Sequence, residues 1–311
     1  MTAGARAARY APGHRSEIRI EPPQKAGRTE LAPSMLVDEA LRVIVASLVV
    51  YLRANEGGLF ASEDPEYVHQ MRVAVRRLRS ALRLFPGSAS AGLHGKHART
   101  LRKVADRLGK VRDLDVLAAS VSASGVLPRV RENQVMMAIR LQAQIARDDA
   151  RSCLRSADYA QLMFRIALWL LARPRHRTAI RLVALARREL AGRHKALMHR
   201  AACFARLAAQ ERHRFRIDVK RARYAAEFFA SLFEHRAAQA YAGALAKLQD
   251  LLGSLTDINT AQALLRELGC DEKIEQCLMD AWSRHAVADD ELEGVIRTCA
   301  EAAGFWKRNR R

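Results

Sequence analysis

The stretch HQMRVAVRRLRSALRLF, residues 69–85, holds one histidine and five arginines and no acidic residue. At about 100° per residue its apolar side chains fall on one side of a helix. The opposite side carries a stripe of cations, namely His69, Arg72, Arg76, Arg79 and Arg83, with Arg77 off the stripe. The pattern predicts an amphipathic helix with one face packed in a core and the other presented to an anion.

The same pattern returns 144 residues later as HRFRIDVKRARYAAEFF, residues 213–229. The offset pairs His69 with His213 and Phe85 with Phe229. The second stripe consists of His213, Arg216, Lys220 and Arg223, with Arg221 beside it. A second segment keeps the offset, since LRKVADRLGKVRDLDV from residue 101 matches LAKLQDLLGSLTDINT from residue 245. These matches predict an internal repeat of two similar helical halves, each of about four helices.

Composition and spacing favour an all-α fold. Aromatic residues are scarce, glycine and proline are sparse after the first thirty residues or so, and no segment alternates as a strand does. We expect the helical halves over about residues 34–173 and 174–305. Residues 1–33 lack apolar periodicity and are predicted to form a disordered basic tail, and residues 306–311 a basic C-terminal tail.

The formal net charge of +20 on 311 residues predicts a polyanionic partner: a nucleic acid, an anionic membrane or a phosphate polymer. The charge is concentrated on the predicted helices. Residues 69–112 carry twelve Lys or Arg and one acid, and residues 212–247 carry eight Lys or Arg and three acids. Because these stripes lack the Glu–Lys alternation of an ordinary solvated helix face, we interpret them as an anion-binding site.

A second basic stripe follows in the first half, made of Lys96, Arg99, Lys103, Arg107 and Lys110. In the second half only Lys247 occupies a matching position, and Glu227 replaces the arginine of position 83. We therefore expect the first half to bind anions more strongly, and Glu227 to weaken the end of its own stripe.

Histidines and acids also suggest metal or catalytic chemistry, which we consider weaker. His69 and His213 stand among arginines, so they are expected to act as extra cations and donors rather than metal ligands. The pairs His94/His97 and His194/His199 lack further ligands. Asp113 and Asp257 follow Gly109 and Gly253 and are interpreted as helix N-caps after a break, while Asp106 and Asp250 orient arginines. A Mg²⁺ site made of these acids is the alternative.

No sequence motif of a known enzyme class occurs, and we expect no catalytic residue, metal or cofactor. The five cysteines include no CxxC pair, which favours a reducing cytosol. The N-terminus has no apolar leader, and the most apolar run, residues 43–52, is too short to span a bilayer. These features predict a cytoplasmic protein without a membrane span.

The two copies of the His-x-x-Arg-x-x-x-Arg/Lys-Arg-x-Arg signature, together with LGKVRDLDVL, resemble the CHAD family, named for a histidine-containing α-helical domain. The likeness covers roughly residues 34–305. It implies two four-helix bundles related by a pseudo-twofold axis, with basic helices around a central cavity or groove. It also implies binding of inorganic polyphosphate without hydrolysis. The first motif matches at His69, Arg72, Arg76, Arg77 and Arg79, and the second at His213, Arg216, Lys220, Arg221 and Arg223.

The leading hypothesis is a non-catalytic module that binds polyphosphate and targets polyphosphate or other storage granules. A nucleic-acid-binding protein is the second, although the stripes offer only Tyr224 for base stacking and Gln70 for base reading. A metal-dependent phosphohydrolase is the third, and it predicts phosphate release with Mg²⁺ or Mn²⁺.

Overall fold

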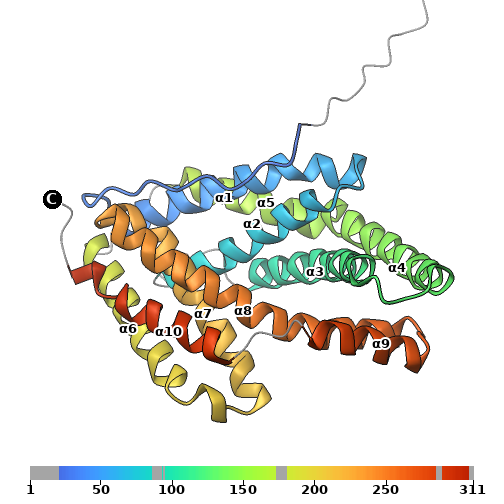
Figure 1. Ribbon diagram of the computed structural model, residues 1–311. Coiled ribbons are helices and arrows are strands. Elements are labelled where there is room, and N and C mark those ends of the chain that lie inside the picture. Colours follow the sequence, from blue (N-terminus) through green and yellow to red (C-terminus); the bar gives the residue numbers. More distant parts are fainter. Residues whose placement is uncertain (1–20, 86–92, 94, 173–180, 285–288, 308–311) are drawn as a thin grey trace, which may run out of the picture.

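A computed structural model describes residues 21–85, 93, 95–172, 181–284 and 289–307 (Figure 1). Within these ranges the chain is all α-helical, as predicted, and its only β pairing is an isolated bridge between Leu36 and Arg181. The helices of the first half are α1 (Val37–Ala61), α2 (Pro65–Leu84), α3 (Lys96–Ser124), α4 (Arg129–Arg155) and α5 (Ala157–Leu171). Those of the second half are α6 (Leu182–Ala201), α7 (Ala209–Phe229), α8 (His235–Glu267), α9 (Glu272–Ser283) and α10 (Asp289–Glu301). Three short 3₁₀ turns follow α6, α7 and α10: η1 (Phe204–Arg206), η2 (Ala230–Leu232) and η3 (Phe305–Lys307).

Helix α2 forms as its sequence predicts. The Asp64 side chain caps its N-terminus by accepting from the backbone N–H of Glu66 at 2.8 Å, and Pro65 occupies the first helical position. The apolar side of the helix is buried, including Met71, Val75 and Leu78. The basic side chains on its other side are partly exposed. The amphipathic pattern therefore sets which face of α2 is left for a ligand.

The helices pack in sequence order within each half (Figure 1). In the first half α1 packs on α2, α2 on α3, and α3 on α4; in the second half α6 packs on α7, and α7 on α8. Helices α9 and α10 both pack against α8. The described residues thus contain five α-helices in each half, one more than the resemblance implies, because a short helix, α5, follows α4 and the partners of α8 are two short helices.

The two halves meet through α2 and α7, the helices that carry the repeated stretch. These helices start 144 residues apart, at Pro65 and Ala209. Phe85 and Phe229, which the repeat pairs, lie against each other with ring centroids 5.8 Å apart. The buried residues of both halves form one continuous core. A pseudo-twofold relation between the halves stays a prediction.

Residues 21–33 do not form the disordered tail predicted for this region. This segment, which we name the N-terminal strap, runs along α1 to the second half (Figure 1). The Tyr67 hydroxyl donates to the carbonyl of Glu21 at 2.8 Å, and the backbone N–H of Leu31 donates to Ser231 Oγ at 2.8 Å. The Leu31 side chain is buried. The strap is ordered because its few apolar and backbone groups find partners in both halves. Residues 1–20 lie outside the described residues.

The C-terminal prediction also needs correction. Trp306 is buried against Tyr241 and His194, with ring centroids 5.4 and 5.5 Å apart. Residues 305–307 form η3, so the chain remains packed on the core beyond residue 305. Residues 308–311 lie outside the described residues.

Gly109 and Gly253 do not break helices, so the interpretation of Asp113 and Asp257 as N-caps is wrong. Helices α3 and α8 continue through both glycines. At Gly109 an added Cβ would lie 2.6 Å from Arg72 Nη1. The glycine lets the Arg72 guanidinium lie against the backbone of α3, and a larger residue would require that side chain to shift.

Helix α1 is long and apolar enough to cross a membrane by length and composition, alone among the described helices. Half of its most apolar window is buried inside the protein. A core helix meets the same two criteria, and the packing of α1 on α2 gives its apolar side chains partners within the chain.

Candidate anion-binding groove

A groove of about 1000 Å³ lies where the two halves meet. Its walls come from α2, α7, η2, the N-terminal half of α8 and strap residues 26–30. We name it the cationic groove after the basic side chains that line it: Arg28, His69, Arg76, Arg77, Arg223 and His235. Three acids, Glu30, Glu227 and Asp250, also line it, so cations prevail. The groove thus combines both copies of the repeated stretch in one cavity.

Arg76 is the central cation contributed by α2. Its guanidinium lies over the ring of Tyr224, 5.6 Å from the ring centroid, which orients it by a cation–π contact. Arg76 Nε and the Tyr224 hydroxyl are both buried and have no hydrogen-bond partner among the residues that the structure describes. Burial raises the pKa of Tyr224, so its hydroxyl stays protonated and can donate. Both groups are therefore available to an anion's oxygen atoms.

Arg77 and Arg223 approach the groove from opposite helices and share one acid, Glu227. Arg223 Nε lies 2.8 Å and Arg77 Nη2 3.6 Å from the Glu227 carboxylate. The Arg77 side chain is only 13% exposed and also lies over the ring of Phe228, 5.4 Å from its centroid. Glu227 thus neutralises part of the charge of two arginines at the junction of α2 and α7.

His69 lies at the N-terminal side of the groove and is partly buried. Burial lowers the pKa of its imidazole, and the nearby cations Arg112, Arg76 and Arg72 lower it further. His69 is therefore poised to gain a proton when an anion offsets those charges. His213, its counterpart in the repeat, is exposed and does not line the groove.

Two further cations of the α2 stripe, Arg72 and Arg79, face α3 instead of the groove, whereas Arg83 lines a hollow shared with α6 and α7. Arg72 pairs with Asp113 at 3.7 Å, with its guanidinium against Gly109. Burial lowers the pKa of Arg79, as does repulsion from Arg83 and Arg102, while Asp106 opposes the shift. These side chains form a basic surface beside the groove, in which Asp113 pairs with Arg72. That Asp106 orients an arginine stays a prediction.

The predicted second stripe on α3 does not reach the groove. Lys96 pairs with Asp158 of α5 at 3.0 Å, and Arg107 pairs with Asp149 of α4 at 2.8 Å. Lys103 lies close enough to Asp158 to lower the pKa of that carboxyl, after the larger effect of Lys96. None of the five residues of this stripe, which include the exposed Arg99 and Lys110, lines the groove. The acids that pair with Lys96 and Arg107 come from the neighbouring helices α5 and α4.

The second half shows a similar division. Arg223 lines the groove, whereas Arg216 and Lys220 do not. Lys247 lies 3.6 Å from Glu291 of α10. Arg221 projects to the other side of α7, into hollows that Arg83 and Arg193 also line. The structure therefore assigns the predicted site residues to different surfaces.

Sequence reasoning missed two groove residues, Arg28 and His235. Arg28 Nη1 lies 3.3 Å from His235 Nε2, which joins the strap to the first turn of α8. Arg28 was counted in the predicted tail, and nothing in the local sequence signals that the tail crosses the second half. His235 follows Glu234, whose side chain caps α8, and this cap fixes its place at the groove.

Within the described residues no group of three or more His, Cys, Asp and Glu side chains is placed to hold a metal ion. His194 Nδ1 lies 3.1 Å from the Tyr241 hydroxyl, in an aromatic cluster with Trp306. Burial lowers the pKa of His194, as it does that of His97. His94 lies outside the described residues.

Fold and groove together define an all-helical protein with a cationic cavity between two basic helices. Residues 43–266 match the sequence model of the CHAD domain. The structure is similar to the crystal structure of the CHAD domain from the plant Ricinus communis, with a TM-score of 0.76 and 30% identity over 88% of this chain and 96% of that chain. PptA from Streptomyces chartreusis shares the fold, with a TM-score of 0.55 and 16% identity over 88% of this chain and 98% of that chain. No curated protein matches the sequence.

The chain belongs to the CHAD domain family. The family match begins at residue 43, so the strap, with Arg28, lies outside it. The groove of this protein is therefore built partly by residues that the family match does not include.

Proposed function

We propose that this protein binds inorganic polyphosphate in the cationic groove and acts as a non-catalytic module in the cytoplasm, at polyphosphate or other storage granules. The observation that carries the proposal is the convergence of Arg76, Arg77 and Arg223 from both copies of the repeat on one cavity. Membership in the CHAD family supports the same ligand, because the resemblance implies polyphosphate binding.

The chemistry of the groove suits a phosphate chain. A guanidinium group can bind phosphate oxygens with two parallel hydrogen bonds. The buried donors of Arg76 and Tyr224 lack partners within the described part of the chain. Burying such donors without a partner costs about 1–3 kcal/mol each, which a phosphate oxygen would recover. Polyphosphate brings one negative charge per phosphate, so successive groups can meet successive cations.

The alternative of nucleic-acid binding has less support from the site. Gln70, the candidate for base reading, is buried and accepts a hydrogen bond from the Tyr51 hydroxyl. Tyr224, the candidate for stacking, is buried, with Arg76 over its ring. Competition between polyphosphate and duplex DNA of matched charge tests this alternative, and preference for DNA would favour it.

The phosphohydrolase alternative has its own test. It predicts phosphate release from polyphosphate on addition of Mg²⁺ or Mn²⁺, lost in Asp113→Ala. We expect no release, because Asp113 pairs with Arg72. Release that depends on Asp113 would replace the non-catalytic proposal.

The direct test is a titration with long-chain polyphosphate at several salt concentrations. Arg76→Gln/Arg223→Gln removes two charges from the groove, and Lys96→Gln/Arg107→Gln removes two from the outer face of α3. Charge-assisted hydrogen bonds contribute about 1.5–3 kcal/mol each, so the groove variant should bind at least about tenfold more weakly. Counterion release predicts that its salt dependence also becomes shallower. Equal losses in both variants would reduce the groove to part of a generally basic surface.

A further inference from the structure

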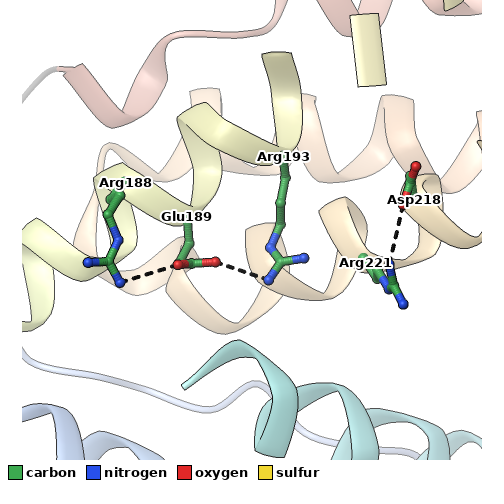
Figure 2. A network of polar contacts seen from close by, with 5 residues as sticks. All are labelled: Arg188, Glu189, Arg193, Asp218 and Arg221. Atoms are coloured by element: carbon green, nitrogen blue, oxygen red, sulfur yellow. Dashed lines mark hydrogen bonds and ion pairs between the residues drawn. The ribbon is translucent and has the colours of Figure 1, made fainter. Parts of the chain in front are cut away.

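A second basic hollow lies on the side of α7 away from the cationic groove. It comprises two adjoining cavities of about 270 and 420 Å³ between the C-terminal end of α2, α6 and α7, and Arg193 and Arg221 line both. We name these two cavities together the arginine cleft. Figure 2 shows Arg188, Glu189 and Arg193 along α6, with Asp218 and Arg221 on α7. Of the cleft's residues only Tyr224 also lines the groove, so the cleft is a separate place on the molecule.

Cations outnumber acids in the cleft. The smaller cavity is lined by Arg83, Arg193 and Arg221 and by no acid. In the larger cavity two arginines share each acid. Glu189 accepts from Arg188 at 3.4 Å and from Arg193 at 3.0 Å.

The acid on α7, Asp218, is shared in the same way. It lies 3.5 Å from Arg221 and also pairs with Arg200. Arg83 forms no ion pair among the described residues, so the cleft keeps an excess of positive charge that its own acids do not offset.

Arg193 shows why this excess of positive charge is energetically unfavourable. Its side chain is only 24% exposed, and its Nε is buried without a hydrogen-bond partner in the described ranges. Burial lowers the pKa of Arg193, Glu189 opposes the shift, and repulsion from Arg221 adds to it. Glu189 offsets part of this charge, but the unused Nε donor and the neighbouring Arg221 leave an unfavourable arrangement that an anion in the space between the two arginines would relieve.

The walls of the smaller cavity restrict the ligand. Beside the arginines it offers the Ser80 hydroxyl, the apolar side chains of Leu84 and Ala225, and Tyr224. Forked guanidinium donors around a small volume suit the tetrahedral oxygens of a phosphate group better than a flat carboxylate or a bulky nucleoside. One or a few linked phosphates are the class of ligand that fits both its size and its donors.

We propose that the arginine cleft is a second anion site, which takes a terminal phosphate or a short phosphate chain between Arg83, Arg193 and Arg221. The proposal does not rest on polyphosphate binding in the groove. The phosphate can belong to a free short chain or to the end of a longer one, and the two sources share the same chemistry.

Calorimetric titration with tripolyphosphate tests the proposal on the full chain. We expect two binding events per chain in the wild type, and only one in Arg193→Gln/Arg221→Gln. The control Arg131→Gln/Arg140→Gln removes the same charge from α4, at the opposite end of the molecule from α6 (Figure 1), and should keep both events. Arg83→Gln, at an exposed residue without an ion pair, should weaken the same event at least threefold without affecting folding.

Groove and cleft are scored separately in the same titration. Arg76→Gln/Arg223→Gln should remove the groove event and keep the cleft event, so failure of one proposal is distinguishable from failure of the other. The proposal of a site in the cleft would be overturned if the wild type showed a single binding event that only the groove variant removes. It would also be overturned if the α4 control lost the same binding event as the cleft variant. Repeating the titration with long-chain polyphosphate distinguishes the two sources of the phosphate. If the cleft variant loses a binding event with tripolyphosphate alone, the cleft binds free short chains. If it loses an event with both ligands, the cleft binds the ends of long chains as well.

Discussion

The repeat matches position 227 of the second half to position 83 of the first, so Glu227 stands where the first half has Arg83. The structure shows what this exchange does, since Glu227 contacts both Arg77 and Arg223 inside the groove. It lowers the positive potential where an anion would bind. It also neutralises part of the charge of Arg77, the more buried of the two arginines. One residue therefore opposes ligand binding and supports folding.

Glu227→Gln should separate these two effects. Removing the charge should tighten polyphosphate binding by about 1 kcal/mol, roughly fivefold, by the Coulomb interaction at a partly buried site. The unfolding free energy should fall by about 1–3 kcal/mol, because Arg77 loses a charged partner. Titration and urea denaturation measure the two quantities. Glu293→Gln, on the exposed face of α10, is the charge-matched control, and a groove variant that does not bind more tightly would contradict the prediction.

His69 makes binding depend on pH. In the ligand-free protein its pKa lies below its usual value of 6.5, because burial and the neighbouring cations disfavour the charged form. A bound phosphate favours that form and raises the pKa. The contribution of His69 to affinity is therefore full below the ligand-free pKa and is lost as pH rises through the pKa of the complex.

Lowering the pH from about 8 to about 6 should accordingly strengthen polyphosphate binding more in the wild type than in His69→Gln. Titrations of both proteins across this range measure the difference. Without ligand the sign is reversed for folding: stability falls as pH drops through the unfolded pKa of about 6.5, because the native state resists protonation. Identical pH profiles of binding in the two proteins would remove His69 from the site.

The N-terminal strap is the segment whose structure is hardest to predict from the sequence. It is held at both ends, by Tyr67 and Asn55 in the first half and by Ser231 in the second. Its four charged residues, Glu21, Lys25, Arg28 and Glu30, sum to zero, whereas residues 1–20 contain four arginines and one glutamate. Charge and structure can therefore be separated by two deletions.

Deleting residues 1–20 should weaken polyphosphate binding only through its net charge of +3, an effect that salt screens. Deleting residues 1–33 should weaken binding further and lower the melting temperature, because the strap wall and the buried Leu31 are lost with no further change in net charge. Titration at low and high salt and thermal unfolding measure both effects. Equal behaviour of the two deletions would mean that the strap contributes nothing to the site.

The amphipathic helices could be predicted because the spacing of apolar and charged residues within one helix determines which of its faces is buried. The faces of α2 and α7 follow from periodicity, and so do Arg76 and Arg223 as groove residues. Periodicity does not show which neighbour a charged face meets, so the sequence predicts Lys96 and Arg107 in the site although they pair with acids of α5 and α4. The sequence also predicts a helix break at Gly109, because the residue that lies against this glycine, Arg72, is on another helix.

At the scale of the whole molecule, the core does not stop at the junction of the halves. Phe85 packs against Phe229, and Trp282 Nε1 of α9 donates to the carbonyl of Ser120 in α3 at 3.4 Å. The buried residues form one cluster across all these contacts. The two halves should therefore unfold together.

Tryptophan positions allow this to be measured. Trp169 is in the first half, and Trp282 and Trp306 are in the second. In Trp169→Phe/Trp282→Phe the fluorescence comes from Trp306, which packs on Tyr241 and His194 of the second half. Its unfolding midpoint should coincide with that of the far-UV circular dichroism of the whole chain. Two separated midpoints would show that the halves are independent folding units.

Tyr224 lines both the cationic groove and the arginine cleft. A ligand in either place would lie next to the same side chain, and two anions so close would repel each other across it. Occupancy of one site would then weaken the other, and thermodynamic reciprocity requires the same factor in both directions. The shared wall makes this protein a candidate for negative cooperativity between two sites of one polypeptide. The ends and the interiors of polyphosphate chains would then be the competing ligands.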